Sequence, residues 1–262
     1  MRLLLFFLLA ATLQVQAAAP PWAKTLTSTK FGSFPIVRPL KLHYTLGWNG
    51  ALHSGDLVFE LNKPGSKYHT TQIYGGSSGV AKTLFPYKAN FVAYLDKKSL
   101  RPLVFVGEET DKREHMRTTN RYKKNSMTSK EVVTAINKKG KDHTRNKSFK
   151  WPAQLGPVSA MYFIRSQELK KGDRLVFVMH PFHSPYYCEV TVLGREKHLG
   201  LDAIKMDIKM RKISSKFTLK PYKKMKESTL WLSDDIDRIP IELRSKVFVG
   251  DVRMTLKSRK LL

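Results

Sequence analysis

The sequence predicts an all-β protein with one short helix, in which a single antiparallel sheet is curled into an open or incomplete barrel. Three observations lead to this prediction. Apolar and polar residues alternate with a period of two along several segments, which is typical of strands with one buried and one solvated face. Only one segment has helical spacing. A glycine interrupts one of the expected strands, as curled sheets require.

The alternating segments follow one another along the chain from near residue 40. The clearest is 204–210, where Ile, Met, Ile and Met alternate with Lys, Asp and Lys. This pattern predicts a strand with one apolar and one charged face. Further strands are expected at Leu57–Leu61, Phe91–Leu95, Leu103–Val106, Leu175–Met179, Tyr186–Val192 and Phe248–Leu256, the last of which contains Gly250.

One short helix is expected from about Val158 to Leu169. Pro157 suits the start of a helix, and Gly172 suits the position just after its end. We expect this helix to pack on the sheet or to plug it. The residues at helical spacing are Val158, Met161, Tyr162 and Arg165.

The N-terminus has the three parts of a secretory signal peptide, which predicts export. Arg2 precedes an apolar run from Leu3 to Leu13, and alanines follow at 17–19. The run is shorter than the roughly 17–25 residues that span a bilayer, so we interpret residues 1–19 as a cleaved signal rather than an anchor. Residues 20–40 have no hydrophobic period and are expected to form a leader or linker before the domain.

Cysteine content narrows the compartment. Cys188 is the only cysteine, so no internal disulfide can form. Small exported domains of animals usually contain several disulfides, and their absence favours a bacterial periplasm or exterior. Because no cysteine lies beside the expected cleavage site, the protein is not expected to be a lipoprotein. No other segment is long and apolar enough to span a membrane.

The chain is strongly basic, with 47 Lys and Arg residues against 21 Asp and Glu and a net charge of +26. Such a surface attracts polyanions. For an exported protein these are lipopolysaccharide, anionic lipid headgroups and acidic glycans, and nucleic acid is not an expected partner. The alternative is that the basic runs are solvated strand faces and hairpin loops. The candidate polyanion surface consists of Lys123, Lys124, Lys138, Lys139, Lys209, Arg211, Lys212, Lys223 and Lys224.

Three patches of the sequence, taken in order, point to a family. They are Tyr44–Gly50 with Ser54-Gly55, Leu155–Arg165 with Leu169–Asp173, and Trp231–Asp235 with Arg238–Pro240 and Gly250. Together they resemble an exported bacterial family known only as domain of unknown function 3108. The resemblance implies one domain over about 41–259, built as an incomplete barrel of antiparallel strands with a helix against it, and it implies no known reaction. The segment 110–150 is longer and more basic than this family leads one to expect.

Two groups of residues of metal-ligand type have structural alternatives. Asp234, Asp235 and Asp237 suit a hard cation, but they also suit a turn in which Arg238 pairs with Asp235 or Asp237. Histidine and cysteine suit zinc, yet these residues lie in a proline-containing loop before a strand, where a buried thiol is ordinary. The second group consists of His180, His183 and Cys188. We favour the structural interpretation of both groups and expect no metal, no cofactor and no catalytic residue.

Two further patterns in the sequence have more than one interpretation. Residues 75–79 resemble a phosphate-binding loop, but the Gly-Lys-Ser/Thr ending is missing, which favours a hairpin loop. Four aromatic residues suit a sugar or lipid pocket, but core packing is the more ordinary role of such residues. They are Tyr44, Trp48, Trp151 and Trp231.

The inner face of the curled sheet is the candidate binding site. We expect a non-enzymatic, exported protein that binds an amphipathic or anionic envelope component, a lipid or a glycan. One alternative is an interaction protein that docks by its basic surface onto lipopolysaccharide or an acidic partner. Another is an envelope hydrolase, for which the sequence shows no polar cluster. The candidate ligand-binding residues are Ile204, Met206, Ile208, Met210, Phe248, Val252, Met254 and Trp231.

Overall fold

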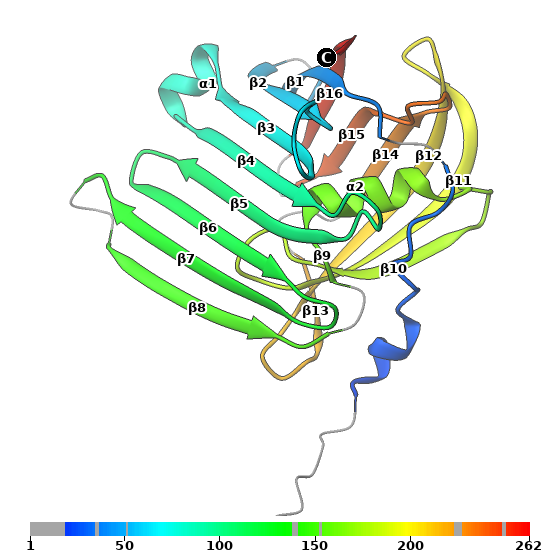
Figure 1. The fold of residues 1–262 in the computed structure, drawn as a ribbon. Coiled ribbons are helices and arrows are strands. Elements are labelled where there is room, and N and C mark those ends of the chain that lie inside the picture. Colours follow the sequence, from blue (N-terminus) through cyan, green and yellow to red (C-terminus); the bar gives the residue numbers. More distant parts are fainter. Residues whose placement is uncertain are drawn as a thin grey trace, which may run out of the picture.

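The computed structural model describes residues 19–34, 37–50, 52–137, 141–151, 154–222, 227–247 and 250–262. Its strands form a 16-stranded sheet (Figure 1). They are β1 (Leu40–Trp48), β2 (Leu52–Leu61), β3 (His69–Ser77), β4 (Lys88–Leu95), β5 (Pro102–Thr110), β6 (Glu114–Tyr122), β7 (Met127–Ala135), β8 (His143–Phe149), β9 (Gln154–Leu155), β10 (Arg174–Met179), β11 (Tyr186–His198), β12 (Leu201–Ile213), β13 (Leu219–Pro221), β14 (Ser228–Ser233), β15 (Pro240–Lys246) and β16 (Asp251–Leu261).

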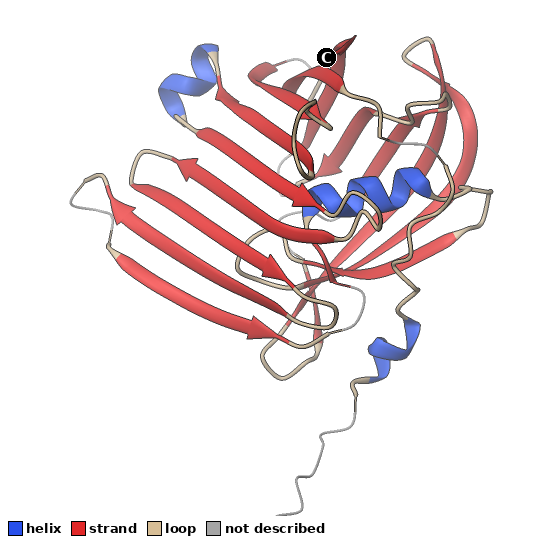
Figure 2. Ribbon diagram, viewed as in Figure 1, coloured by secondary structure: helices blue, strands red, loops and turns tan. Residues whose placement is uncertain are grey.

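Strand order explains the shape of the sheet. The order is β8-β7-β6-β5-β4-β3-β2-β1-β16-β15-β14-β12-β11-β10-β9, with β13 paired to β12. All neighbours are antiparallel except the short β9–β10 pair. The strands β8 and β9 form two separate edges, so the sheet curls without closing (Figure 2). The predicted fold class, an antiparallel sheet curled into an incomplete barrel, is therefore confirmed.

Irregularities in register help the sheet to curl. Bulges interrupt the pairing between Trp231 and Leu232 and between Val192 and Gly194, and such bulges increase local twist. Gly250 has a different role from the one expected. It precedes β16 in a turn with φ +76°, where an added Cβ would lie 1.8 Å from Asn49 Oδ1, so the position requires glycine for the turn rather than for a bend within a strand.

The helix α2 (Pro157–Ser166) lies inside the curl of the sheet (Figures 1 and 2). It starts at the expected proline but ends three residues before the expected Leu169, which has φ +60° and cannot continue the helix. One side of the helix packs against the inner face of β10–β14 through Ala160, Phe163 and Ile164. Its other side contributes Val158 and Tyr162 to a cluster with β4–β7. The helix thus joins the two halves of the sheet.

The segment before β1 is part of the domain, although a leader or linker was expected there. The 3-10 helix η1 (Pro21–Thr25) buries Trp22 against the outer face of β10–β12, among Val176, Val178 and Tyr187. Thr27 then exchanges hydrogen bonds with the backbone of Val176, and Phe31 packs on the inner side. We call residues 19–34 the strap, because they wrap around the β10 edge and cover it. Covered edges are one way in which sheets avoid pairing with other chains.

Candidate ligand-binding pocket

Two of the predicted inner-face residues lie in the core between the sheet and α2. Ile204 and Met206 on β12 are fully buried against α2, and Ile208 and Met210 are half-buried beside the same cluster. The side chains of the helix fill the space that a ligand would need, so a ligand reaches Ile204 and Met206 only if α2 moves. Val252 and Met254 are half-buried on β16. Phe248 lies outside the described residues.

Trp231 lies on the opposite face from the residues with which it was grouped. It pairs with Lys205, one position away from Ile204, and therefore points to the outer face. There its ring stacks on His198 at 4.1 Å and its Nε1 donates to Glu196 Oε1 at 2.8 Å. The four aromatic residues considered above are not brought together, because Tyr44 is in the inner core, Trp48 is exposed and Trp151 packs on Trp22.

The acidic turn after β14 is a structural corner. Asp235 Oδ1 accepts hydrogen bonds from Ser233 Oγ and from the amides of Asp237 and Arg238. Burial alone would raise the pKa of Asp235, but these bonds and Arg259 outweigh burial and lower it. The expected pairing of Arg238 with the aspartates is wrong. Arg259 bonds to Asp235 and Asp237 at 2.6 and 3.1 Å instead.

Arg238 and Arg165 lock this corner to α2. Arg238 donates to the carbonyls of Arg165, Gln167 and Glu168 at the end of the helix. Arg165 is buried and donates in return to the carbonyls of Asp237 (2.6 Å) and Arg238 (3.0 Å). The third family patch is therefore an architectural contact, which holds the helix inside the sheet.

The histidine and cysteine residues are not gathered into a metal site. No group of three or more His, Cys, Asp or Glu residues in the described ranges could hold a metal ion. Burial raises the pKa of the Cys188 thiol to about 12, so it stays protonated. Burial lowers the pKa of His180 to about 3, so its ring is neutral against Phe149. His183 Nδ1 is 3.0 Å from Ser129 Oγ.

The glycine-rich segment also differs from the expected hairpin loop. Gly75 and Gly76 belong to β3, and Gly79 begins the short helix α1 (Gly79–Leu84). An added Cβ at Gly76 would lie 2.2 Å from the carbonyl oxygen of Tyr87. These glycines therefore allow close backbone approach between β3 and the segment before β4.

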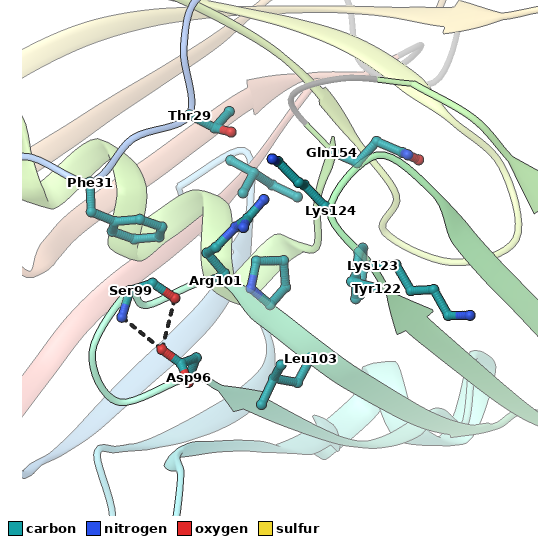
Figure 3. A pocket seen from close by; sticks show the side chains of 12 residues that line it. Thr29, Phe31, Asp96, Ser99, Arg101, Leu103, Tyr122, Lys123, Lys124 and Gln154 are labelled. Atoms are coloured by element: carbon teal, nitrogen blue, oxygen red, sulfur yellow. Dashed lines mark hydrogen bonds between the residues drawn. The ribbon is translucent and has the colours of Figure 1, made fainter.

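A pocket of about 320 Å³ opens at one end of the sheet, between the strap and the turns β4–β5 and β6–β7 (Figure 3). Four parts of the chain, distant in sequence, supply its walls. The lining residues are Thr29, Phe31, Asp96, Ser99, Arg101, Pro102, Leu103, Tyr122, Lys123, Lys124, Gln154 and Leu155.

Local turn chemistry places the cations at this pocket. Asp96 Oδ1 accepts hydrogen bonds from the amides of Lys98 and Ser99 and from Ser99 Oγ, which fixes the β4–β5 turn. The amide of Ser99 is the main cause that lowers the pKa of Asp96, whose charge is therefore satisfied within the turn. Leu100, with φ +54°, then turns the chain so that Arg101 stands at the mouth of the pocket.

The pocket is cationic above an apolar floor. Figure 3 shows the side chains of Arg101 and Lys124 pointing into the same space beside Phe31, while Lys123 extends away from it. Within the described part of the chain, neither Arg101 nor Lys124 has an ion-pair partner. Phe31 and Leu155 form apolar walls, with Leu155 fully buried.

Tyr122 closes the inner end of the pocket. It is buried beneath the turn that it begins, and its ring belongs to the cluster with α2. Burial raises the pKa of its phenol, which therefore remains a neutral hydroxyl. The lining residues contain no histidine, cysteine or second carboxylate beside Asp96, and Asp96 is held by its own turn.

The described members of the predicted polyanion surface lie in two places. Lys123 and Lys124 are at the turn beside the pocket, where Lys124 points into it, whereas Lys209, Arg211 and Lys212 lie on β12. Lys209 is 3.5 Å from Asp207, and Arg211 lies over the Tyr187 ring at 4.8 Å. Lys138, Lys139, Lys223 and Lys224 lie outside the described residues. The sequence analysis did not identify Arg101 or Phe31 as residues of a binding site. The one signal in the sequence was the Arg101-Pro102 step before a strand, which concerns Arg101.

The architecture is similar to that of a solved structure with low sequence identity. A crystal structure of a β-barrel-like protein of domain of unknown function DUF1849 from Brucella abortus has a TM-score of 0.55 at 13% identity, and the match covers 87% of this chain and 99% of that one. A Bacteroides fragilis protein with a YmcC-like fold matches with a TM-score of 0.31 at 8% identity, over 88% and 99% of the two chains. No curated protein matches in sequence.

The last two findings concern membrane-spanning helices and the family to which the chain belongs. No helix among the described residues is both long and apolar enough to span a lipid bilayer. The family model described as "Protein of unknown function (DUF3108)" matches residues 43–257, which includes all three sequence patches and nearly the whole sheet. The chain therefore belongs to the DUF3108 family.

Proposed function

We propose that the protein is exported and binds, without catalysis, an anionic amphipathic component of the cell envelope in the pocket beside Arg101. The observation that supports this most directly is the pair of cations, Arg101 and Lys124, without ion-pair partners in the described chain above the apolar walls of Phe31 and Leu155. A guanidinium and an ammonium bind phosphate or carboxylate by charge-assisted hydrogen bonds.

The N-terminal sequence supports export. Arg2, the apolar run Leu3–Leu13 and the alanines at 17–19 have the order of a secretory signal. Residues 1–18 are outside the described part of the structure. An exported basic protein meets anionic lipids and glycans, so the charge of +26 and the proposed ligand are complementary.

Pocket size limits the ligand. A volume of about 320 Å³ is at the lower end of the roughly 300–1,000 Å³ that ligand pockets typically have. It fits a phosphorylated or carboxylated headgroup with the first part of an acyl chain, and it is too small to enclose a whole two-chain lipid. We therefore expect the remainder of the ligand to extend from the pocket.

Binding of lysophosphatidic acid below its micelle concentration tests the proposal by calorimetry. The R101S/K124S variant should bind at least about tenfold more weakly than the wild type, because each lost cation removes a charge-assisted hydrogen bond. The matched control is K216S/K220S, which removes the same charge from the β12–β13 hairpin and should bind as the wild type does. Thermal melts by circular dichroism establish that both variants fold.

Two further probes separate the parts of the ligand. Lysophosphatidylcholine retains the chain but is zwitterionic, and glycerol 3-phosphate retains the phosphate without the chain. Both should bind more weakly than lysophosphatidic acid. Equal losses in R101S/K124S and K216S/K220S would instead support the alternative of docking through overall positive charge, which weakens with ionic strength.

A further inference from the structure

Exposed apolar side chains gather at the end of the sheet opposite the pocket. Of the sixteen large apolar side chains exposed in the described chain, six lie on the segment 80–87 and on the β1–β2 hairpin tip. They are Val80 (66% exposed), Leu84 (56%), Phe85 (73%), Tyr87 (36%), Trp48 (39%) and Leu52 (52%). Clusters of this kind mark interaction sites more often than scattered single residues do.

The α1 helix exposes Val80 and Leu84 because it contacts mainly the neighbouring strands β2 and β3. It has six residues and none of them is buried. The amide of Ser78 donates to the carbonyl of Ser54 at 3.2 Å, which holds the start of α1 against β2. Figure 1 shows α1 projecting from the end of the sheet. Val80 and Leu84 on α1, and Phe85 at its C-cap, are therefore exposed to solvent although they belong to a helix or its end.

Two lysine side chains lie next to the exposed apolar residues of α1. Within the described ranges, Lys82 on the helix and Lys88 at the start of β4 have no ion-pair partner. Of the nearby carboxylates, Glu109 accepts a hydrogen bond from the Tyr87 hydroxyl, and Asp56 Oδ2 is 3.1 Å from His53 Nε2. Burial raises the pKa of the Glu109 carboxyl.

We propose that this end, the α1 tip (residues 48–50, 52 and 80–88), docks on an anionic lipid bilayer. Leu84 and Phe85 enter the headgroup region, and Lys82 and Lys88 contact the phosphates. Interfacial binding of this kind combines buried apolar area with attraction to anionic lipids. A second copy of the chain is the less favoured occupant, because two surfaces of a protein with net charge +26 repel each other. This surface is separate from the pocket, and the inference does not depend on the proposed function.

Vesicle sedimentation tests the inference. The protein is purified from an expressing bacterium, with its N-terminus established by mass spectrometry, and mixed with vesicles of phosphatidylethanolamine and phosphatidylglycerol. The L84S/F85S variant should bind at least about tenfold more weakly than the wild type. The control L199S/L201S changes two comparably exposed residues at the β11–β12 tip (58% and 46%) and should bind normally. Circular dichroism establishes that both variants fold.

A tryptophan placed in the α1 tip reports whether this surface itself contacts the vesicles, whatever other segments bind lipid. Tryptophan fluorescence of F85W should shift to shorter wavelength on addition of vesicles, and that of L199W should not. The inference is overturned if L84S/F85S binds as well as the wild type, if F85W does not shift, or if the wild type does not bind. A dimer in sedimentation velocity that L84S/F85S abolishes, without vesicle binding, would overturn it in favour of a second copy.

Discussion

The two ends of the sheet have similar kinds of side chain in opposite arrangements. At the pocket end, Arg101 and Lys124 line a pocket together with Phe31 of the strap and Leu155 of β9. At the α1 tip, Lys82 flanks apolar side chains that project into solvent. What differs is the covering, since Phe31 of the strap lines one end, whereas the apolar side chains at the other end are exposed. Under the two proposals, the recessed end would bind a single molecule and the protruding end would bind a membrane surface.

The comparison implies that the pocket end is stabilised by buried contacts. Among the substitutions below, Arg165→Met should therefore lower the free energy of unfolding the most. The substitution leaves the carbonyls of Asp237 and Arg238 without their buried donor. We expect the free energy of unfolding in urea to fall by about 3 kcal/mol. Arg174→Met removes an exposed pair with Glu189 and should cost less than about 1 kcal/mol. Equal losses in the two variants would contradict the proposed lock between α2 and the corner.

The pH dependence of stability also tests whether buried contacts matter at this end, because His180 is buried. Its pKa is about 3 in the folded protein because of burial, against about 6.5 when unfolded. Between these values the unfolded chain binds a proton that the folded chain does not. Stability should therefore fall as the pH falls from about 6.5 to about 3, by up to about 1.4 kcal/mol per pH unit from this group. Urea unfolding of His180→Met should show a shallower slope over that window, and an unchanged slope would exclude His180 as its source.

Phe31→Ala should affect the pocket end alone. The ring packs edge-to-face on Phe163 with centroids 5.9 Å apart and lines the pocket. Because it is half-buried, we expect a loss of about 1–2 kcal/mol in the free energy of unfolding, at the lower end for aromatic truncations. Affinity for lysophosphatidic acid should fall as well, and binding to vesicles should stay at the wild-type level. A fall in both binding activities would show that the two ends are coupled.

The smallest effect on stability is expected at the α1 tip. Phe85 is 73% exposed, so Phe85→Ala should change the free energy of unfolding by less than about 0.5 kcal/mol. The same aromatic truncation would thus be costly at Phe31 and nearly neutral at Phe85. A loss above about 1 kcal/mol would indicate that α1 is packed more tightly than its exposure implies.

The fold class could be predicted from the sequence because strand alternation is local information. Ile204 and Met206 were placed correctly on the inner side for this reason. Trp231 was grouped with the wrong face, although it alternates with Leu230 and Leu232, which pack in the inner cluster. The strap has no periodicity to detect, since Trp22 packs on the outer face and Phe31 on the inner one.

The pocket could not be predicted because its residues are assembled only by the topology. Arg101, Lys124 and Phe31 belong to three segments that the sequence separates, and each looks like an ordinary turn or linker residue alone. The role of Arg238 was misjudged for a related reason. Its neighbours in sequence are aspartates, but its neighbours in space are the carbonyls that end α2.

The pairing of β1 with β16 constrains the order in which the protein can fold. Leu40 lies opposite Leu261, so the middle of the sheet joins the two most distant strands of the chain. Hairpins such as β6–β7 can form early from local contacts, but this central seam requires the whole chain to be present. Folding dominated by such distant pairings is slow, typically on a timescale of milliseconds to seconds. For a chain that crosses a membrane unfolded, the seam delays completion of the sheet until translocation has finished.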